Sequence, residues 1–386
     1  MTGALSTPSP LSAQRQEWRR FWKIVFFATI LPFLILIGAL EGLGWSLGDT
    51  YTPRALVRAL EANPNLIWMG VHAHAHARLK LAQIAAERPE VLVMGTSRLG
   101  RVRAGMFAPY SFYNLARVSW PFDSYVDIMR HFPAGYRPKV ILFTVDFFMF
   151  TPGYQEHLRD TAPVFDHDFS EHLIELHNVA TQLLQRPQLI WKRTDPQGRA
   201  ALGISAIRGD EAFFKDGSER PPLELLAAAG RSPQDIMKRP IRQYVGGGPQ
   251  MAGPEMASLK QFADLAREKG IPLVGVAMPI YGPALRMLEQ DPDYRIIQDF
   301  RNHVAQGYFE KMGILFYDLS TLPPYSEDYR YFFDGVHPGW PLTTAAIQAL
   351  GSDPRFHALL PRLDMAALQS QLNADRQSSQ HILQNQ

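Results

Sequence analysis

The sequence predicts an α/β fold, a mainly parallel sheet with helices on both faces, preceded by one transmembrane helix. Two observations support this prediction. Short apolar runs alternate with amphipathic helical segments over residues 88–352, which is typical of strands joined by crossover helices. Near the N-terminus, the segment from Ile24 to Leu40 contains no charged residue, which is typical of a membrane span.

Residues 21–45 form the predicted signal anchor, because about 20 apolar residues suffice to cross the hydrocarbon core. Acidic Glu41 and Asp49 follow the uncharged segment from Ile24 to Leu40. Four basic residues precede it: Arg15, Arg19, Arg20 and Lys23. The positive-inside rule therefore predicts a single-pass inner (plasma) membrane protein, with residues 1–20 cytoplasmic and the C-terminal domain periplasmic or extracytoplasmic. A cleaved signal peptide and a buried core helix are the alternatives.

The elements after the anchor follow from apolar pattern and turn residues. Residues 46–87 are predicted to be a helical juxtamembrane segment. The predicted strands cover 91–94, a stretch ending at Leu115, 139–145, 273–277 and 314–317, and the predicted helices cover 255–269, 294–312 and 341–350. Residues 151–253 interrupt this rhythm and are interpreted as an insertion that forms a lid or shapes the substrate site. The tail 353–386 is predicted to be partly disordered, because it is rich in Gln, Ser and Asn beyond Leu368.

Two short motifs supply a nucleophile, a base and a carboxylate. The strand 91–94 stops at Gly95-Thr96-Ser97, which would place Ser97 at the carboxyl edge of the sheet, where ligands bind in α/β folds. Far downstream, Asp334 stands three residues before His337. A serine hydroxyl becomes a useful nucleophile when an imidazole takes its proton, and a carboxylate can orient that imidazole. The motifs therefore predict a Ser97–His337–Asp334 triad.

This pair of motifs resembles the SGNH (GDSL-like) hydrolase superfamily, whose serine ends the first strand and whose Asp and His share a late D-x-x-H turn. The membrane-anchored branch is the most similar, including the teichoic-acid D-alanyl transfer protein and the exopolysaccharide O-acetylation proteins. The resemblance covers about residues 88–352 and implies a three-layer flavodoxin-like sheet. It implies acyl transfer from an acylated donor to an envelope polysaccharide or teichoic-acid-like acceptor, with a membrane-bound O-acyltransferase as possible partner. Trp340 matches an H-x-G-W run of some relatives and is a candidate for substrate binding.

The sequence departs from the superfamily at two oxyanion positions. Where the family has a Gly, this chain has Ala116, whose N–H still offers a donor beside that of Ser97. Where the family has an Asn, the strand 139–145 leads into Asp146, which would need to be protonated to donate. Arg98, with Arg101 and Arg103, is a candidate for binding an anionic polymer, and a solvated basic face is the alternative.

Several alternatives stay open. Ser97 and Asp334 could be helix caps, the protein could be a plain esterase, or it could be an inactive scaffold or polymer-binding subunit. The absence of Cys excludes disulfides and thiol nucleophiles, and a net charge of +2 without a basic run gives no indication of nucleic-acid binding. No pattern predicts a cofactor or a metal. We interpret His72 and His76 as part of a polar helix. The run Asp166-His167-Asp168 is interpreted as part of the insertion, and Gly246-Gly247-Gly248 as a loop.

Overall fold

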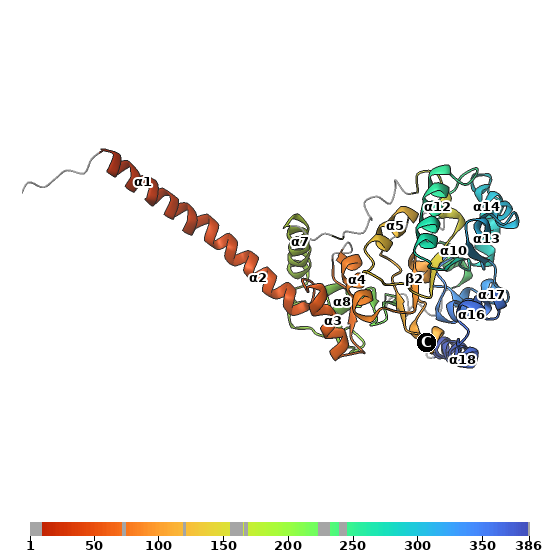
Figure 1. Ribbon diagram of the computed structural model, residues 1–386. Coiled ribbons are helices and arrows are strands. Elements are labelled where there is room, and N and C mark those ends of the chain that lie inside the picture. The colour runs from red at the N-terminus through yellow and green to blue at the C-terminus, as the bar shows by residue number, and fades with distance from the viewer. Residues whose placement is uncertain are drawn as a thin grey trace, which may run out of the picture.

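The computed structural model describes residues 10–71, 75–118, 121–154, 165, 169–222, 232–238 and 245–384. It begins with one continuous helix built from α1 (Pro10–Val25), the π-helical turn η1 (Phe26–Ile30) and α2 (Leu31–Leu47). Pro32 has no N–H to donate to the preceding turn, which accounts for the local change of helical type. The helix projects away from the rest of the protein (Figure 1).

This helix is long and apolar enough to span a membrane. The apolar helical segment Gln14–Leu47 has 34 residues. At 1.5 Å per residue it measures ~50 Å, which exceeds the ~30 Å hydrocarbon core, so both of its ends can lie outside the lipid. The structure therefore confirms the prediction of one N-terminal helix that is long and apolar enough to span a membrane.

A five-stranded sheet forms the centre of the larger domain. Its strands are β2 (Val91–Met94), β3 (Phe112–Asn114), β4 (Val140–Thr144), β8 (Leu273–Ala277) and β9 (Ile314–Asp318). They are ordered β3-β2-β4-β8-β9 and every neighbouring pair is parallel, with Val91 opposite Val140 and Leu273 opposite Ile314. The predicted α/β class with a parallel sheet is confirmed.

The two faces of the sheet pack into separate hydrophobic cores, since side chains alternate along each strand. Leu92 and Met94 belong to one core, whereas Val91 and Val93 belong to the other. The first core also receives apolar residues of α4 (Ala75–Glu87), α5 (Phe122–Arg130), α12 (Gly253–Glu268), α13 (Gly282–Glu289) and α14 (Ile296–Ala305). The second receives those of α16 (Trp340–Gly351), α17 (Pro354–Leu359) and α18 (Met365–Gln384). In Figure 1, α5, α12, α13 and α14 lie above β2, and α16, α17 and α18 lie below it.

A second, smaller sheet corrects the prediction for the juxtamembrane segment. The juxtamembrane segment 46–87 is not all helical, since α3 (Pro53–Ala62) is followed by strand β1 (Ile67–Trp68). The insertion supplies the partners β5 (Ala201–Leu202), β6 (Ala212–Phe213) and β7 (Glu219–Arg220), in the order β5-β1-β6-β7. Trp68 and Phe213 are buried against each other, with ring centroids 5.1 Å apart. Much of the described insertion is therefore joined to the juxtamembrane segment. It also contains α7 (Phe169–Gln185), η6 (Pro187–Trp191), α8 (Ile204–Arg208) and α10 (Pro233–Lys238).

Two further predictions are corrected towards the C-terminus. The single helix predicted over 294–312 is divided into α14 and α15 (Tyr308–Lys311), because Gly307 adopts a left-handed φ of +66°. The tail predicted to be disordered continues as α18, in which Leu368 and Leu372 are buried. Single-turn helices complete the described chain: η2 (Ser97–Leu99), η3 (Ala104–Phe107), η4 (Phe147–Phe150), η7 (Pro292–Tyr294), η8 (Tyr325–Glu327) and η9 (Tyr329–Tyr331).

Gly95 follows β2 directly and lies close to Thr144 of β4, and its φ is +143°. A Cβ at this position would lie 2.1 Å from Thr144 Oγ1. We expect Gly95→Ala to lower the free energy of unfolding by about 3 kcal/mol or more, since it combines backbone strain with overpacking. Gly135→Ala is the matched control, because Gly135 also has a positive φ (+70°) but no atom within 4 Å of its Cβ position. It should cost only ~1–2 kcal/mol. Denaturant unfolding would measure both variants. If Gly95→Ala and Gly135→Ala lose the same free energy of unfolding, contact with Thr144 is not the reason for glycine at position 95.

Candidate active site

Ser97 is presented by a tight turn at the carboxyl end of β2. Thr96 N–H donates to Thr144 Oγ1 (3.2 Å) and Thr96 Oγ1 accepts from Arg98 N–H (3.3 Å). Thr96 therefore caps the short helix η2, and Ser97 is its first residue. The alternative that Ser97 is itself the cap does not hold, so its hydroxyl is available for another role.

The Asp334–His337 motif forms a turn before α16. Asp334 Oδ1 accepts hydrogen bonds from the N–H groups of Val336 (2.9 Å) and His337 (2.8 Å), which fixes the turn. An isolated β-bridge pairs Phe332 with Pro338 across it. Helix α16 has Gly339 as its N-cap, without a side-chain cap, so Asp334 does not cap this helix.

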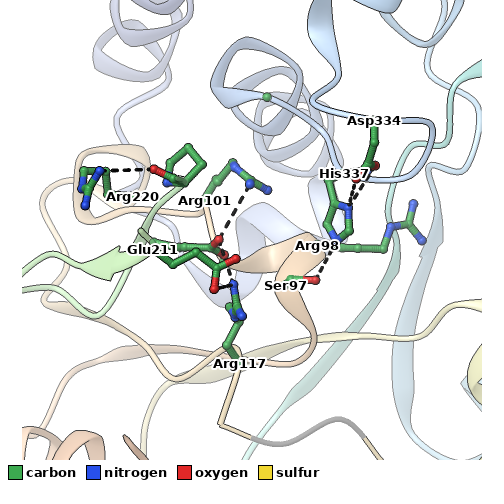
Figure 2. Close-up of polar contacts among 12 residues, drawn as sticks. Ser97, Arg98, Arg101, Arg117, Glu211, Arg220, Asp334 and His337 are labelled. Carbon is green, nitrogen blue, oxygen red and sulfur yellow. Dashed lines mark hydrogen bonds and ion pairs between the residues drawn. The ribbon is translucent and has the colours of Figure 1, made fainter. Parts of the chain in front are cut away.

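The two motifs meet, although 240 residues separate them along the chain. Ser97 Oγ lies 2.8 Å from His337 Nε2, and His337 Nδ1 lies 2.8 Å from Asp334 Oδ2 and 3.0 Å from Oδ1 (Figure 2). The carboxylate thus faces the nitrogen that does not face the serine, which favours the tautomer with the proton on Nδ1. In that tautomer Nε2 can accept the Ser97 proton. The structure therefore brings together the three residues predicted as a triad, in the predicted order.

Asp334 is held in its charged form. Burial alone would raise the pKa of its carboxyl group, but the hydrogen bond and charge of His337, with the N–H groups of Val336 and His337, lower it from 3.8 to about 2. The Asp334 side chain is only 7% exposed. An ionised carboxylate in this position stabilises the imidazolium that forms when His337 takes a proton.

This depressed pKa predicts a pH dependence of stability. Because the pKa of Asp334 is lower in the folded state, its contribution is complete above about pH 4 and is lost as the pH falls towards about 2. The expected contribution is on the order of 2 kcal/mol. Denaturant unfolding should show wild type more stable than Asp334→Asn at pH 6, with a gap that closes by about pH 2. A gap that is independent of pH would contradict the assignment.

Arg98 was predicted to bind substrate, and this prediction is wrong. Its side chain is buried and links several segments of the chain. It is 2% exposed, and its guanidinium donates to the backbone oxygens of Val336 (3.0 Å from Nε), Met278 and Pro279 (2.8 Å from Nη2). It also forms an ion pair with Asp146. Since Val336 lies inside the Asp334–His337 turn, Arg98 ties that turn to the ends of β4 and β8. Arg98 is thus a positioning residue beside the predicted nucleophile.

Asp146, predicted as an oxyanion donor, is paired with Arg98 and accepts from Met278 N–H (3.2 Å). Burial raises the pKa of its carboxyl group, while Arg98 and the Met278 N–H oppose the rise. A carboxyl group that faces a guanidinium acts as an acceptor. The prediction that Asp146 donates to an oxyanion is therefore wrong, and the alternative of an Arg98–Asp146 ion pair holds.

The Ala116 N–H, predicted as the second oxyanion donor, already donates to Asn114 Oδ1 (2.8 Å). Asn114 Nδ2 in turn donates to the carbonyl groups of Leu99, Gly100 and Val102. Asn114 therefore fastens the loop after Ser97 to the end of β3. Of the predicted donors, the Ser97 N–H alone is seen without a hydrogen bond within the described residues.

Sequence reasoning missed a partly buried cluster of charges beside the triad (Figure 2). Arg117 Nη1 lies 3.1 Å from Glu219 Oε1 and 2.5 Å from Glu211 Oε2, and Arg101 Nη2 lies 3.8 Å from Glu219 Oε1. Burial favours the neutral form of Glu219, but Arg117 and Arg101 outweigh it and lower its pKa. Glu219 N–H also donates to the Gly100 carbonyl (2.7 Å). The insertion thus supports the loop that follows Ser97. Nothing in the sequence pattern indicated the contact between Glu219 and Gly100.

The other predicted positions lie elsewhere. Trp340 is half-buried at the start of α16, with the Arg103 guanidinium 5.9 Å from its ring centroid. His76 is buried against the rings of Trp68 and Phe213. His72 and residues 166–168 lie outside the described residues. Among the residues that are described, no group of three metal-ligating side chains occurs.

Comparison with protein-family models, curated proteins and solved structures finds no match to this chain.

Proposed function

We propose that this chain is a membrane-anchored, extracytoplasmic serine O-acyltransferase or esterase of SGNH type that acts on a cell-envelope polymer or exopolysaccharide. One observation supports this most strongly. Ser97 Oγ, His337 and Asp334 form a continuous hydrogen-bonded chain at the carboxyl edge of a parallel sheet. A proton relay of this kind has no evident structural purpose, since the turn is already fixed by the hydrogen bonds that Asp334 Oδ1 accepts from the Val336 and His337 N–H groups.

The proposed reaction has two halves. Ser97 Oγ gives its proton to His337 Nε2 and attacks the carbonyl carbon of an acyl ester or thioester, and the Ser97 N–H stabilises the tetrahedral oxyanion. The imidazolium returns the proton to the leaving oxygen or sulfur as that bond breaks, which leaves an acyl-Ser97 ester. His337 then takes a proton from the acceptor hydroxyl, which attacks the acyl carbon. The imidazolium returns this proton to Ser97 Oγ as the acyl–serine bond breaks, which restores the free enzyme. A sugar hydroxyl as acceptor gives transfer, and water gives hydrolysis.

We also propose that the larger domain has a three-layer flavodoxin-like fold. The strand order β3-β2-β4-β8-β9 reads 2-1-3-4-5 within the five-stranded sheet, which is the flavodoxin-like order. In this order the ligand site lies where the strand order reverses, next to the first strand of the sheet. That strand is β2, which ends immediately before Gly95-Thr96-Ser97.

The proposed location is the inner membrane, with the catalytic domain outside the cytoplasm. The basic residues before the span favour a cytoplasmic N-terminus. A retained anchor is favoured over a cleaved signal because α2 packs against α7 of the insertion, where Glu41 Oε2 lies 3.0 Å from His172 Nε2. A reporter fused after Gln386 should be active only on the periplasmic side. Cytoplasmic activity would contradict both the topology and the envelope function.

A second candidate function is an inactive scaffold or polymer-binding subunit of an envelope-modification complex. The state of the oxyanion donors favours it, because Ala116 N–H is engaged and Asp146 is paired. Catalysis would then depend on a single identified backbone donor.

Labelling with a serine-directed fluorophosphonate separates these candidates. The enzyme should be labelled in the wild type and in Ser352→Ala, a matched control because Ser352 is exposed and donates only to the Gln348 carbonyl (2.9 Å). Ser97→Ala should not be labelled. Labelling that survives Ser97→Ala, or that is absent from the wild type, would favour the scaffold. For a labelled enzyme, turnover that increases with added polysaccharide acceptor identifies a transferase.

A further inference from the structure

Helix α7 exposes apolar side chains near its N-terminal end. Phe169 is 73% exposed, Ile174 44% and Leu173 36%. Farther along the helix Leu176, Val179 and Leu183 are buried, each at most 7% exposed. Helix α7 is therefore already packed on the protein, and its exposed apolar residues are a second surface with no occupant among the described residues.

The contacts of α7 fix its level along the anchor. The two helices pack together, and His172, in the first turn of α7, is paired with Glu41 of α2. Farther along, Val179 and Leu183 share a hydrophobic core with Leu47, the last residue of α2. The N-terminal end of α7 is thus the end that lies nearest the membrane span. Figure 1 shows α7 beside the C-terminal part of α2.

Glu41 marks where the lipid ends. It is the first charged residue after the uncharged segment Ile24–Leu40. Trp45, one turn further on, is 45% exposed and packs on Tyr51 with ring centroids 4.8 Å apart, as interfacial aromatic residues commonly do. Phe169 precedes His172 by three residues, which places it ~4.5 Å further along the helix axis, towards the apolar span.

We propose that the exposed N-terminal residues of α7, Phe169, Leu173 and Ile174, insert into the outer interface of the bilayer beside α2. Lipid is favoured over a protein partner because this surface is continuous, through the Glu41–His172 pair, with the segment that spans the membrane. Partial burial of an apolar helical face at the depth of the headgroups and upper acyl chains is the behaviour of interfacial helices. The consequence is a second point of attachment, which fixes the rotation and height of the domain over the membrane. This inference rests on the membrane anchoring proposed above.

The absence of cysteine from the sequence allows a direct test. Single-cysteine variants of the full chain, labelled with a nitrobenzoxadiazole fluorophore, would be placed in lipid nanodiscs with and without brominated acyl chains. The test positions are Phe169→Cys and Leu173→Cys. Leu34→Cys, within the span and 52% exposed, is the positive control, and Leu184→Cys, at the far end of α7 and 83% exposed, is the negative control. All four positions are exposed, so the fold should tolerate the label.

Brominated lipid should quench the Leu34→Cys, Phe169→Cys and Leu173→Cys probes at least twofold more than the Leu184→Cys probe. If the Leu34→Cys probe is quenched but both α7 probes behave like the Leu184→Cys probe, the interfacial contact is wrong while the anchor stands. An unquenched Leu34→Cys probe would refute the anchor and this inference together. Probes at 169 and 173 that are shielded from aqueous iodide yet not quenched by brominated lipid would show a protein contact, which would also overturn the proposal.

Discussion

The single variants Ser97→Ala and His337→Ala should each turn over an activated ester about 10⁴-fold more slowly, or worse, because nucleophile and base act as one unit. The physical basis is the 2.8 Å contact between Ser97 Oγ and His337 Nε2. Asp334→Asn should be almost as severe, with a loss of ~10⁴-fold, since an amide would favour the wrong imidazole tautomer. Steady-state kinetics on the detergent-solubilised chain would measure these effects.

The control is the double variant Ser97→Ala/His337→Ala, which should be no slower than either single variant. Circular dichroism and thermal unfolding would verify that each variant keeps the fold, and Ser352→Ala should keep full activity. Losses that multiply in the double variant would show that Ser97 and His337 act independently, contrary to a shared relay.

Removal of the Arg98 guanidinium should give the second large effect, a loss of about 3–5 kcal/mol in stability for Arg98→Met. The reason is that Asp146, 2% exposed, would be left buried without its cation. Arg98→Met/Asp146→Leu should recover most of the loss, because no unpaired charge would remain. Arg362→Met is the matched control, since the Arg362 side chain is 61% exposed and its pairing with Glu90 is long, at 3.4 Å. That exposed pair should be worth less than about 1 kcal/mol.

A kinetic measurement distinguishes positioning from simple stability. Arg98→Lys keeps a charge for Asp146 but has no planar fork to reach the carbonyl groups of Val336, Met278 and Pro279 together. We expect this variant to remain folded but to have a lower kcat with little change in KM, because the turn that holds His337 is loosened. A folded Arg98→Lys enzyme with unchanged kcat would show that Arg98 only stabilises the fold.

The local pattern of apolar residues was sufficient to predict much of the five-stranded sheet. The apolar runs at 91–94 and 273–277 match strands β2 and β8, because strands buried on both faces are continuous hydrophobic segments. The same logic failed at 46–87, where a two-residue strand (Ile67–Trp68) is too short to give a periodic signal. It also failed for the tail, where two buried leucines in a polar helix were too few to outweigh a Gln- and Ser-rich composition.

The sequence predicted only those site residues whose type and place in a short motif both indicate a catalytic role. Ser97, Asp334 and His337 stand in short segments whose residue types suggest their roles. The roles of Arg98 and Ala116 depend on contacts with segments distant in sequence, or on a side chain two residues away that competes for the same N–H. Arg98 follows Ser97 in a tight 3₁₀ turn, so the two side chains leave in different directions, one to His337 and one into the core. No periodicity rule distinguishes them.

The most direct measurement of the central claim is to trap the acyl-enzyme intermediate. The full chain would be incubated with 4-nitrophenyl acetate, quenched in acid, digested and examined by mass spectrometry. The proposed mechanism predicts one acetyl group on the peptide that contains Ser97, present in the wild type and absent from both Ser97→Ala and His337→Ala. Acetylation that is missing from Ser97, or that is equally strong without His337, would contradict the proposal that this relay makes Ser97 a nucleophile.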